Sequence, residues 1–546
     1  MTLHINPISS LEKVFLEGDF NPAPYTAASA LRGERFSYQL ALRLTDSPRA
    51  DVAVAVDGPL ADCVVLSQVV NVPSELPAYS ETDDFYLRKR PGLYPDLLAP
   101  LPGGRMTLPP EAWRALWVQV TVPEDQAAGD YPVTVRFTAK DGQTLAESTF
   151  TLSVIPAALP EQTLVYTNWF HCDCIASYYG DEVFSEAHWA RIGQFMALYR
   201  ASGATCILTP VLTPPLDTEV GGERPTVQLV GIRQQGDRYS FDFSLLGRYL
   251  DLARSHGIER FEIAHFFTQW GAAHAPKVIA EVDGQHRRVF GWETDAAGAP
   301  YRAFLAQLIP ALLDYLRGRG VLDNCYFHIS DEPSLEHLDS YRAAREGVVG
   351  LLAGCKIMDA LSNYDFYAQG LVDHPVPASN HIEPFLAHQV PELWTYYCCS
   401  QHRDVSNRFI AMPSCRNRVL GCQLFKYDIA GFLQWGYNFY YSQYSAYPVN
   451  PFLTTDAVQA FPSGDAFVVY PGPEGPLPSL RLWVFHEALQ DMRAMQLLAG
   501  RIGKDAVTAL IDEGLDAPVT FSAYPHSAAY VLALREKINR RIAETC

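Results

Sequence analysis

Two adjacent carboxylates close one of the apolar runs in this 546-residue chain. Asp331 and Glu332 follow a segment that contains Tyr326, Phe327 and Ile329. Apolar surroundings on one side and a second carboxylate on the other both disfavour ionisation, so one of the two carboxyl groups should have a raised pKa. A protonated acid beside an ionised carboxylate is the pair that cleaves glycosidic bonds. The alternative is structural, because acidic residues are also favourable at a helix N-terminus.

Aromatic and polar side chains at the predicted carboxyl ends of other apolar runs form a second group of candidates. Sugar rings stack their C–H faces on aromatic planes, although Tyr and Trp are also common in half-buried strands, and many members of such a set are core residues. Their clustering at one rim predicts a carbohydrate-binding surface. The candidate sugar-binding residues are Trp169, Asp173, His265, Trp270, Trp394, Tyr396, Trp435, Tyr437 and Asn438.

The segment His171 to Cys174 brings soft metal ligands close together. The spacing is not that of a C-x-x-C knuckle, and no matching cysteine pair follows, so a zinc site is disfavoured. We expect no metal ion here and expect Asp173 or His171 to bind sugar hydroxyls. The sequence also lacks a G-x-S-x-G elbow, a P-loop and a dinucleotide fingerprint, and we expect no cofactor.

The elements that must position these residues follow Pro156, where short apolar runs alternate with amphipathic stretches. This alternation is typical of βαβ units, and the pattern predicts helices over 185–203 and 242–257. Eight strand candidates fit a (β/α)8 barrel, whose catalytic groups stand at the carboxyl ends of the strands. The candidates are LVYTNWF from residue 164, CILTP from 206, FEIAHF from 261, CYFHISDE from 325, KIMDALS from 356, VPASNHI from 376, LWTYYCC from 393 and FLQWGYNFY from 432.

The segments on either side of this barrel have different patterns. Apolar residues recur at every second position over 36–42, 116–122 and 150–154, which predicts antiparallel strands with one buried face. The C-terminal part is predicted to be helical from Leu480 to Leu498 and again near its end. We therefore predict a multidomain α/β chain with an antiparallel β-sandwich (1–158), a catalytic (β/α)8 barrel (159–460) and a mostly helical extension packed on the barrel (461–546).

Composition limits the partners and the compartment. The net charge is −19 and no basic run could follow a phosphate backbone, so we expect no nucleic-acid partner. No apolar stretch is long enough to span a membrane, and the first residues lack the features of a signal peptide, so we expect a cytoplasmic protein without a membrane partner. The eleven cysteines do not resemble a disulfide framework. The composition is compatible with a homo-oligomer.

Beyond these patterns, the chain resembles glycoside hydrolase family 123 through a set of short motifs in a fixed order. The known members of this family are β-N-acetylgalactosaminidases. One departure is His486, where an arginine is expected, and this bears on packing more than on catalysis. The motifs are Arg32-Gly33-Glu34, Asp331-Glu332-Pro333, Trp394 to Cys398, Trp435 to Asn438, Gly464 to Gly472, Ser479-Leu480-Arg481 and Gln490-Asp491.

The resemblance implies an exo-acting retaining glycosidase that releases N-acetylgalactosamine with the substrate's own 2-acetamido oxygen as nucleophile. Glu332 would protonate the leaving oxygen and later deprotonate water, and Asp331 would accept a hydrogen bond from the acetamido N–H. Tyr396, Trp394 and Trp435 would hold the acetamido methyl group. The alternatives are a related barrel glycosidase of other sugar specificity and a non-catalytic carbohydrate-binding protein.

Overall fold

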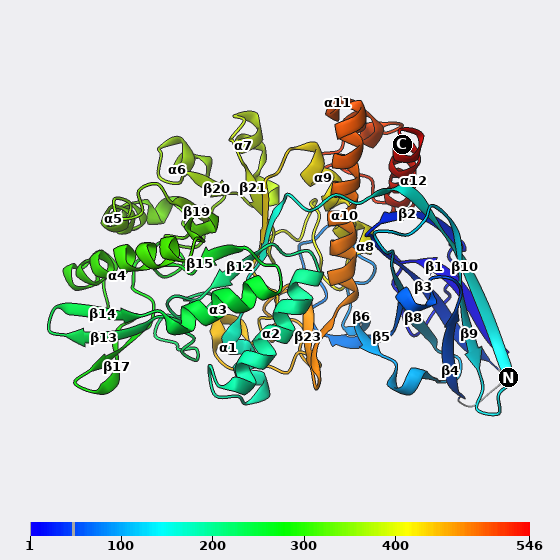
Figure 1. The fold of residues 1–546 in the computed structure, drawn as a ribbon, viewed down its shortest axis with the longest axis horizontal. Coiled ribbons are helices and arrows are strands. Elements are labelled where there is room, and N and C mark those ends of the chain that lie inside the picture. Colours follow the sequence, from blue (N-terminus) through cyan, green and yellow to red (C-terminus); the bar gives the residue numbers. More distant parts are fainter. Residues whose placement is uncertain (1, 46–49) are drawn as a thin grey trace.

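The N-terminal part of the chain forms two five-stranded sheets that enclose a shared apolar core (Figure 1). The computed structural model describes residues 2–45 and 50–546. All strand pairings in these sheets are antiparallel except that of β2 with β10. The first sheet has the order β1 (Thr2–Ser9), β3 (Arg35–Thr45), β8 (Trp113–Thr121), β5 (Val64–Ser74), β6 (Gly92–Pro100). The second has the order β2 (Ala27–Arg32), β10 (Thr144–Ala158), β9 (Gly129–Thr138), β4 (Ala50–Asp57), β7 (Arg105–Leu108).

The alternating sequence pattern explains this core. Val133, Val135 and Phe137 of β9 point inward and are buried, while the residues between them are partly exposed. Leu152 of β10 and Leu40 of β3 meet them in the same cluster. The predicted antiparallel strands over 36–42, 116–122 and 150–154 are confirmed as parts of β3, β8 and β10.

An eight-stranded parallel sheet follows and curls into a nearly closed barrel. Seven of the eight predicted segments begin within one residue of an observed strand, but the segment predicted from residue 376 overlaps β20 only at Val376. The two edge strands of this sheet are β20 and β21, and they meet through a single parallel bridge between Ala378 and Tyr396. The strands are β11 (Val165–Asn168), β12 (Cys206–Thr209), β15 (Arg260–Ile263), β18 (Cys325–Phe327), β19 (Lys356–Ala360), β20 (His374–Val376), β21 (Trp394–Tyr396) and β22 (Gly431–Gln434).

Helices connect these strands along the outside of the barrel (Figure 1). The two predicted helices are confirmed as α2 and α3, and the side chain of Ser185 caps α2 by accepting a hydrogen bond from the backbone N–H of His188. None of the helices in the described ranges is long and apolar enough to cross a membrane. The helices are α1 (Cys172–Tyr179), α2 (Glu186–Ala201), α3 (Ser244–Ser255), α4 (Ala299–Gly318), α5 (Leu338–Val348), α6 (Tyr364–Ala368), α7 (Glu383–Ala387), α8 (Ser414–Arg418) and α9 (Leu420–Lys426).

Two small sheets were not predicted. A four-stranded sheet extends from the barrel beside α4, and a two-stranded hairpin precedes the long C-terminal helix (Figure 1). The four-stranded sheet has the order β14 (Arg238–Asp242), β13 (Gly231–Gln235), β16 (Val278–Val282), β17 (Gln285–Phe290). The hairpin consists of β23 (Val469–Gly472) and β24 (Gly475–Pro478).

The C-terminal helices join the barrel to the sandwich. α10 (Leu480–Ile502) lies between the two, and α11 (Lys504–Asp512) and α12 (Ala528–Glu544) follow it (Figure 1). Leu480 and Val484 of α10 pack with Trp117 of the sandwich in one apolar cluster. Arg481 adds a buried ion pair with Asp96 of β6 (Nε to Oδ1, 2.7 Å). The C-terminal part is therefore helical, as predicted, and it contacts the sandwich as well as the barrel.

A loop of the sandwich also supports segments of the barrel part. Asp83, between β5 and β6, binds the guanidinium of Arg416 through both carboxylate oxygens (2.8 and 2.7 Å). The hydroxyl of Tyr86 donates to the carbonyl oxygen of His402 (2.8 Å), and the backbone N–H of Ser463 donates to the carbonyl oxygen of Leu76 (2.8 Å). The segments fixed in this way lie next to residues that line the cavity described below.

Candidate active site

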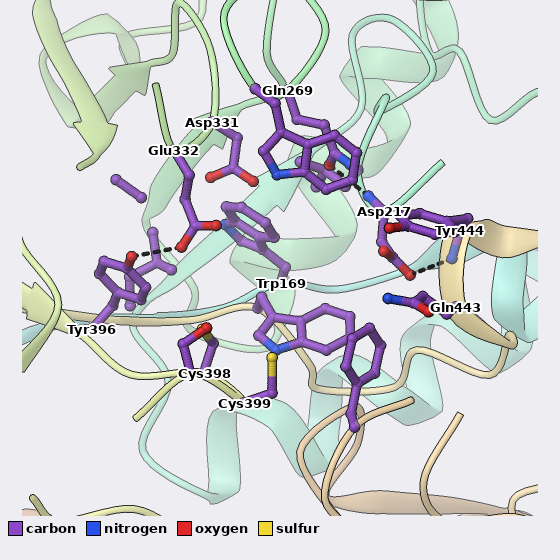
Figure 2. Close-up of a pocket in the computed structure, with 17 residues that line it drawn as sticks. Trp169, Asp217, Gln269, Asp331, Glu332, Tyr396, Cys398, Cys399, Gln443 and Tyr444 are labelled. Atoms are coloured by element: carbon purple, nitrogen blue, oxygen red, sulfur yellow. Dashed lines mark hydrogen bonds between the residues drawn. The ribbon is translucent and has the colours of Figure 1, made fainter. Parts of the chain in front are cut away.

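A cavity opens at the carboxyl end of the barrel. It encloses about 760 Å³, including its open mouth, and its wall comes from the ends of the strands and the loops that follow them. Asp331 and Glu332 lie on one side of it and Asp217 and Tyr444 on the other (Figure 2). The lining residues are Trp169, Leu216, Asp217, Gln269, Trp270, Asp331, Glu332, Ala360, Tyr396, Cys398, Cys399, Ser400, Leu433, Trp435, Gln443, Tyr444 and Phe461.

The backbone fixes the two adjacent carboxylates from both sides. The N–H of Trp270 donates to the carbonyl oxygen of Asp331 (2.9 Å), and the N–H of Glu332 donates to the carbonyl oxygen of Ala360 (3.0 Å). Glu332 has a φ of 44°, a left-handed conformation that costs a non-glycine residue on the order of 1–3 kcal/mol. The following helical turn has its N-cap at Ser334, so the pair faces the cavity and does not cap a helix.

The two carboxyl groups have different surroundings. The hydroxyl of Tyr396 donates to Oε1 of Glu332 (2.5 Å). Burial raises the pKa of Glu332, and the hydrogen bond from Tyr396 offsets part of this rise. Burial also raises the pKa of Asp331 well above its usual range, and the neighbouring charge of Glu332 adds to the effect. Within the described ranges, no group donates a hydrogen bond to the Asp331 carboxylate, which leaves it free to accept one from a ligand.

A buried polar network lies beneath the cavity floor. The indole N–H of Trp169 donates to Oε1 of Glu262 (2.6 Å), and His328 contacts the same oxygen through Nε2 (2.7 Å) and Asp359 through Nδ1 (3.3 Å). Burial lowers the pKa of His328, but hydrogen bonds to the two carboxylates outweigh burial and raise it to about 9. His328 is therefore a cation at neutral pH, and its charge favours the ionised form of Asp331.

His265 packs against this network through its ring and does not line the cavity. Its ring stacks on that of His328 (centroids 4.2 Å apart) and meets the edge of Trp169 (5.4 Å). Burial lowers its pKa well below the usual range. His265, His328 and Asp359 lie close enough together to suggest a metal site, but both nitrogens of His328 already face carboxylates. The side chain of His328 is thus committed to an ion-paired role.

Asp173 also lies away from the cavity. Both of its carboxylate oxygens accept hydrogen bonds from Arg224 (2.7 and 2.8 Å), and the same guanidinium contacts Nδ1 of His171 (3.1 Å). All three side chains are buried. The guanidinium occupies the position that a metal ion would need between His171, Asp173 and Cys174, so these residues hold the start of α1 against the loop after β12.

Four of the predicted aromatic residues line the cavity: Trp169, Trp270, Tyr396 and Trp435. The indole N–H of Trp435 donates to Oδ2 of the buried Asp465 (2.9 Å), which fixes the ring. Trp270 is 41% exposed, and its ring meets that of Tyr444 edge to face (6.0 Å). These side chains give the cavity the aromatic walls expected for a sugar site.

Trp394, Tyr437 and Asn438 lie elsewhere. Trp394 is the first residue of the three-residue strand β21, so it lies at the amino end of the barrel, where it packs on Tyr326 (5.0 Å). Its predicted position at the carboxyl end is wrong by the length of that strand. Tyr437 stacks on Phe170 (5.7 Å) in the core. The amide of Asn438 exchanges two hydrogen bonds with the backbone of His171.

Comparison with known proteins identifies the family. The model described as "Glycoside hydrolase 123, catalytic domain" matches residues 169–498, which is more than half of the chain. The chain belongs to glycoside hydrolase family 123. The resemblance drawn from the ordered motifs is thereby confirmed.

One solved structure supports the fold of this family 123 chain. A family 123 glycoside hydrolase from Clostridium perfringens, studied for glycolipid glycan hydrolysis, matches with a TM-score of 0.75 at 15% identity, over 100% of this chain and 98% of that one. A β-glucuronidase from Parabacteroides merdae matches with a TM-score of only 0.31 at 11% identity, over 89% of this chain and 51% of that one. None of the curated proteins searched matches the chain.

Several lining residues of this family 123 glycoside hydrolase were not predicted from the sequence. They come from loops after β12, β15, β21 and β22, where no hydrophobic period identifies them. Left-handed backbone recurs here, with φ of 39° at Asp217, 56° at Trp270 and 59° at Tyr444. Such conformations concentrate where surrounding contacts fix a functional site. The unpredicted polar and sulfur-containing members are Asp217, Gln269, Cys398, Cys399, Ser400, Gln443 and Tyr444.

Proposed function

We propose that this glycoside hydrolase is an exo-acting, retaining β-N-acetylgalactosaminidase that works by substrate-assisted catalysis. The observation that carries the proposal is the asymmetry of the two adjacent carboxylates. Glu332 accepts a hydrogen bond from Tyr396, whereas the buried Asp331 has no hydrogen-bond donor within the described residues and faces the cavity.

Glu332 is suited to be the general acid and base. Its pKa is raised by burial, so the carboxyl group carries a proton to higher pH than an exposed glutamic acid does. It protonates the leaving oxygen in the first step and deprotonates the attacking water in the second. Its partial exposure to the cavity leaves the proton accessible to the substrate.

Asp331 is suited to orient the acetamido group. In its ionised form, which the neighbouring His328 cation favours, its carboxylate accepts a hydrogen bond from the acetamido N–H. This bond directs the carbonyl oxygen toward C1 and stabilises the positive charge that develops on the acetamido group. The attack forms a bond from this oxygen to C1 as the bond from C1 to the leaving oxygen breaks. Because the nucleophile is already attached to the sugar ring, the step gains a high effective molarity.

The position of the pair agrees with this division of labour. Ordinary retaining glycosidases place an acid and a protein nucleophile about 5–5.5 Å apart on either side of the scissile bond. Here the two carboxyl groups belong to consecutive residues and lie on one side of the cavity (Figure 2). A nucleophile from the substrate removes the need for a carboxylate on the opposite face. Trp169, Tyr396 and Trp435 supply aromatic surface for the ring and the acetamido methyl group.

A panel of 4-nitrophenyl glycosides tests the proposal. The β-N-acetylgalactosaminide should be cleaved, and the β-galactoside, which has no acetamido group, should not. The β-N-acetylglucosaminide keeps the acetamido nucleophile but has the opposite orientation at its 4-hydroxyl, so it should be cleaved more slowly. Proton NMR should show the β-anomer of the sugar as the first product. The chain's own side chains supply the catalytic groups, so a chelator should leave the rate unchanged. Equal cleavage with and without the acetamido group would contradict the proposal.

A further inference from the structure

The side of the cavity facing the carboxylate pair carries a second pair of polar side chains. Asp217 follows β12 and Gln269 follows β15, and both line the cavity (Figure 2). We propose that Asp217 and Gln269 form the subsite that binds ring hydroxyls of the terminal sugar remote from its anomeric carbon. This inference rests on the proposed glycosidase function and adds the residues that recognise the far end of the sugar.

The two residues are fixed to each other and to a third loop. Oε1 of Gln269 accepts a hydrogen bond from the backbone N–H of Asp217 (2.6 Å). Oδ2 of Asp217 accepts one from the backbone N–H of Tyr444 (3.1 Å), and the hydroxyl of Ser445 donates to the carbonyl oxygen of Asp217 (2.6 Å). Left-handed φ values at Asp217 and Tyr444 show that these contacts determine the loop conformation.

These contacts leave one donor and one acceptor unused. Among the described residues, none pairs with Nε2 of Gln269, although Gln269 is only 6% exposed. Within residues 2–45 and 50–546, no group donates to Oδ1 of Asp217. Native proteins rarely leave a buried amide N–H unpaired, because the loss of its bonds to water is unfavourable. A ligand that brings both an acceptor and a donor would satisfy both groups.

A sugar hydroxyl has this chemistry. Its oxygen accepts a hydrogen bond from the amide N–H, and its O–H donates to the carboxylate. Burial raises the pKa of Asp217 to about 6, so its carboxylate is still mostly ionised at neutral pH and serves as the stronger kind of acceptor. One hydroxyl can bridge the two residues, or two hydroxyls can bind one residue each.

The position of the pair selects which hydroxyls bind. In Figure 2 the ring of Trp169 lies between Glu332 and Asp217. If Glu332 reaches the glycosidic oxygen at C1, a sugar lying on Trp169 presents its opposite edge to Asp217 and Gln269. The hydroxyls on that edge are those at C4 and C6, with C3 next to them. Such a site also favours exo action, because a further sugar attached at these hydroxyls would lose the bonds.

Two variants of nearly unchanged size separate recognition from packing. Gln269→Glu retains Oε1 for the N–H of Asp217 but replaces the free donor with an acceptor. Asp217→Asn retains an oxygen for the N–H of Tyr444 but removes the charge. Asp283→Asn, the same exchange at a turn between β16 and β17 outside the cavity, is the control. Thermal unfolding of all variants should match that of the wild type.

The experiment measures kcat/KM for the 4-nitrophenyl β-N-acetylgalactosaminide and its 3-, 4- and 6-deoxy analogues. On the parent substrate, each cavity variant should lose roughly 10- to 100-fold, the loss expected when a hydrogen bond that involves a charged group is removed. On the analogue that lacks the recognised hydroxyl, kcat/KM of the wild type should fall by a similar factor. On that analogue the variants should differ from the wild type by less than about threefold, because the hydroxyl that the substituted side chain would bind is absent.

The outcomes distinguish this inference from the proposed function. The subsite would be overturned, with the glycosidase activity intact, if the wild type cleaves the parent substrate but the loss from each substitution adds in full to the loss from each missing hydroxyl, for all three analogues. Unfolding of both cavity variants would mean that the pair is structural and would also overturn it. A wild type that cleaves no 2-acetamido glycoside would overturn the proposed function, and the subsite with it.

Discussion

Replacing Tyr396 with Phe tests how the cavity tunes its general acid. The hydroxyl lies 2.5 Å from Oε1 of Glu332, and burial together with the charge of Glu332 keeps the pKa of Tyr396 well above its usual range. Tyr396 is therefore a donor throughout the pH range of an assay. A donor stabilises the ionised carboxylate, so its loss should raise the pKa of Glu332 further.

The magnitude follows from the strength of this kind of bond. A hydrogen bond to a charged group contributes about 1.5–3 kcal/mol, and 1.36 kcal/mol corresponds to one pKa unit, so the shift should be about one to two pH units. Glu332 must be protonated to act as the acid, and the alkaline limb of kcat/KM against pH reports the loss of this proton. In Tyr396→Phe this limb should therefore move to higher pH by that amount.

The assay is a pH profile of kcat/KM with a 4-nitrophenyl glycoside, in which the released 4-nitrophenol is measured after the reaction has been stopped. The two carboxyl groups titrate as a pair, but Tyr396 donates to Glu332 and, among the described contacts, not to Asp331, so movement of the alkaline limb assigns it to Glu332. Tyr470→Phe is the matched control, because Tyr470 also donates to a buried carboxylate, that of Asp96 (2.6 Å), outside the cavity. An alkaline limb that stays in place, or that moves to lower pH, would refute the reasoning.

Other substitutions test separate parts of the structure. Glu332→Gln should slow glycosides with poor leaving groups far more than activated aryl glycosides, whereas Asp331→Asn should slow both kinds alike; equal leaving-group dependence would contradict these roles. Asp96→Asn should destabilise the protein by about 3–5 kcal/mol in denaturant unfolding, because Arg481 would be left buried without its partner, and a loss below about 1 kcal/mol would be inconsistent with that pair. Trp270→Ala should raise KM for substrates with extended aglycones while kcat stays unchanged; a uniform loss of kcat would indicate a different role.

The barrel could be predicted because its strands are buried on both sides. Each reads as a short apolar run, and helical patterns separate the runs, so seven of the eight strands were located to within one residue, while β20 was met only at its last residue, Val376. The outer four-stranded sheet has no such signal, since strands such as β14 and β17 are largely exposed and polar. Short strands also limit the accuracy of placement, as the three residues of β21 separate Trp394 at one end of the barrel from Tyr396 at the other.

The site could be predicted only in part. Asp331 and Glu332 were identified because two adjacent acidic residues close the apolar run that begins with β18. The environment of Asp173 depends on Arg224, which is 51 residues away along the chain, and no local pattern reports this pairing. Asp217 and Gln269 lie in loops whose conformation is set by contacts with other loops, so their meeting in the cavity becomes visible only in three dimensions.

The central claim, that the substrate supplies the nucleophile, is tested most directly by fluorination of the acetamido group. Each fluorine withdraws electron density from the attacking carbonyl oxygen while Asp331 and Glu332 stay unchanged. The account predicts that kcat/KM falls stepwise from the acetamido to the mono-, di- and trifluoroacetamido substrate, with the same leaving group throughout. A rate that is insensitive to fluorination, together with covalent labelling of Asp331 by a 2-fluoro glycoside, would show that the protein supplies the nucleophile and would contradict the account.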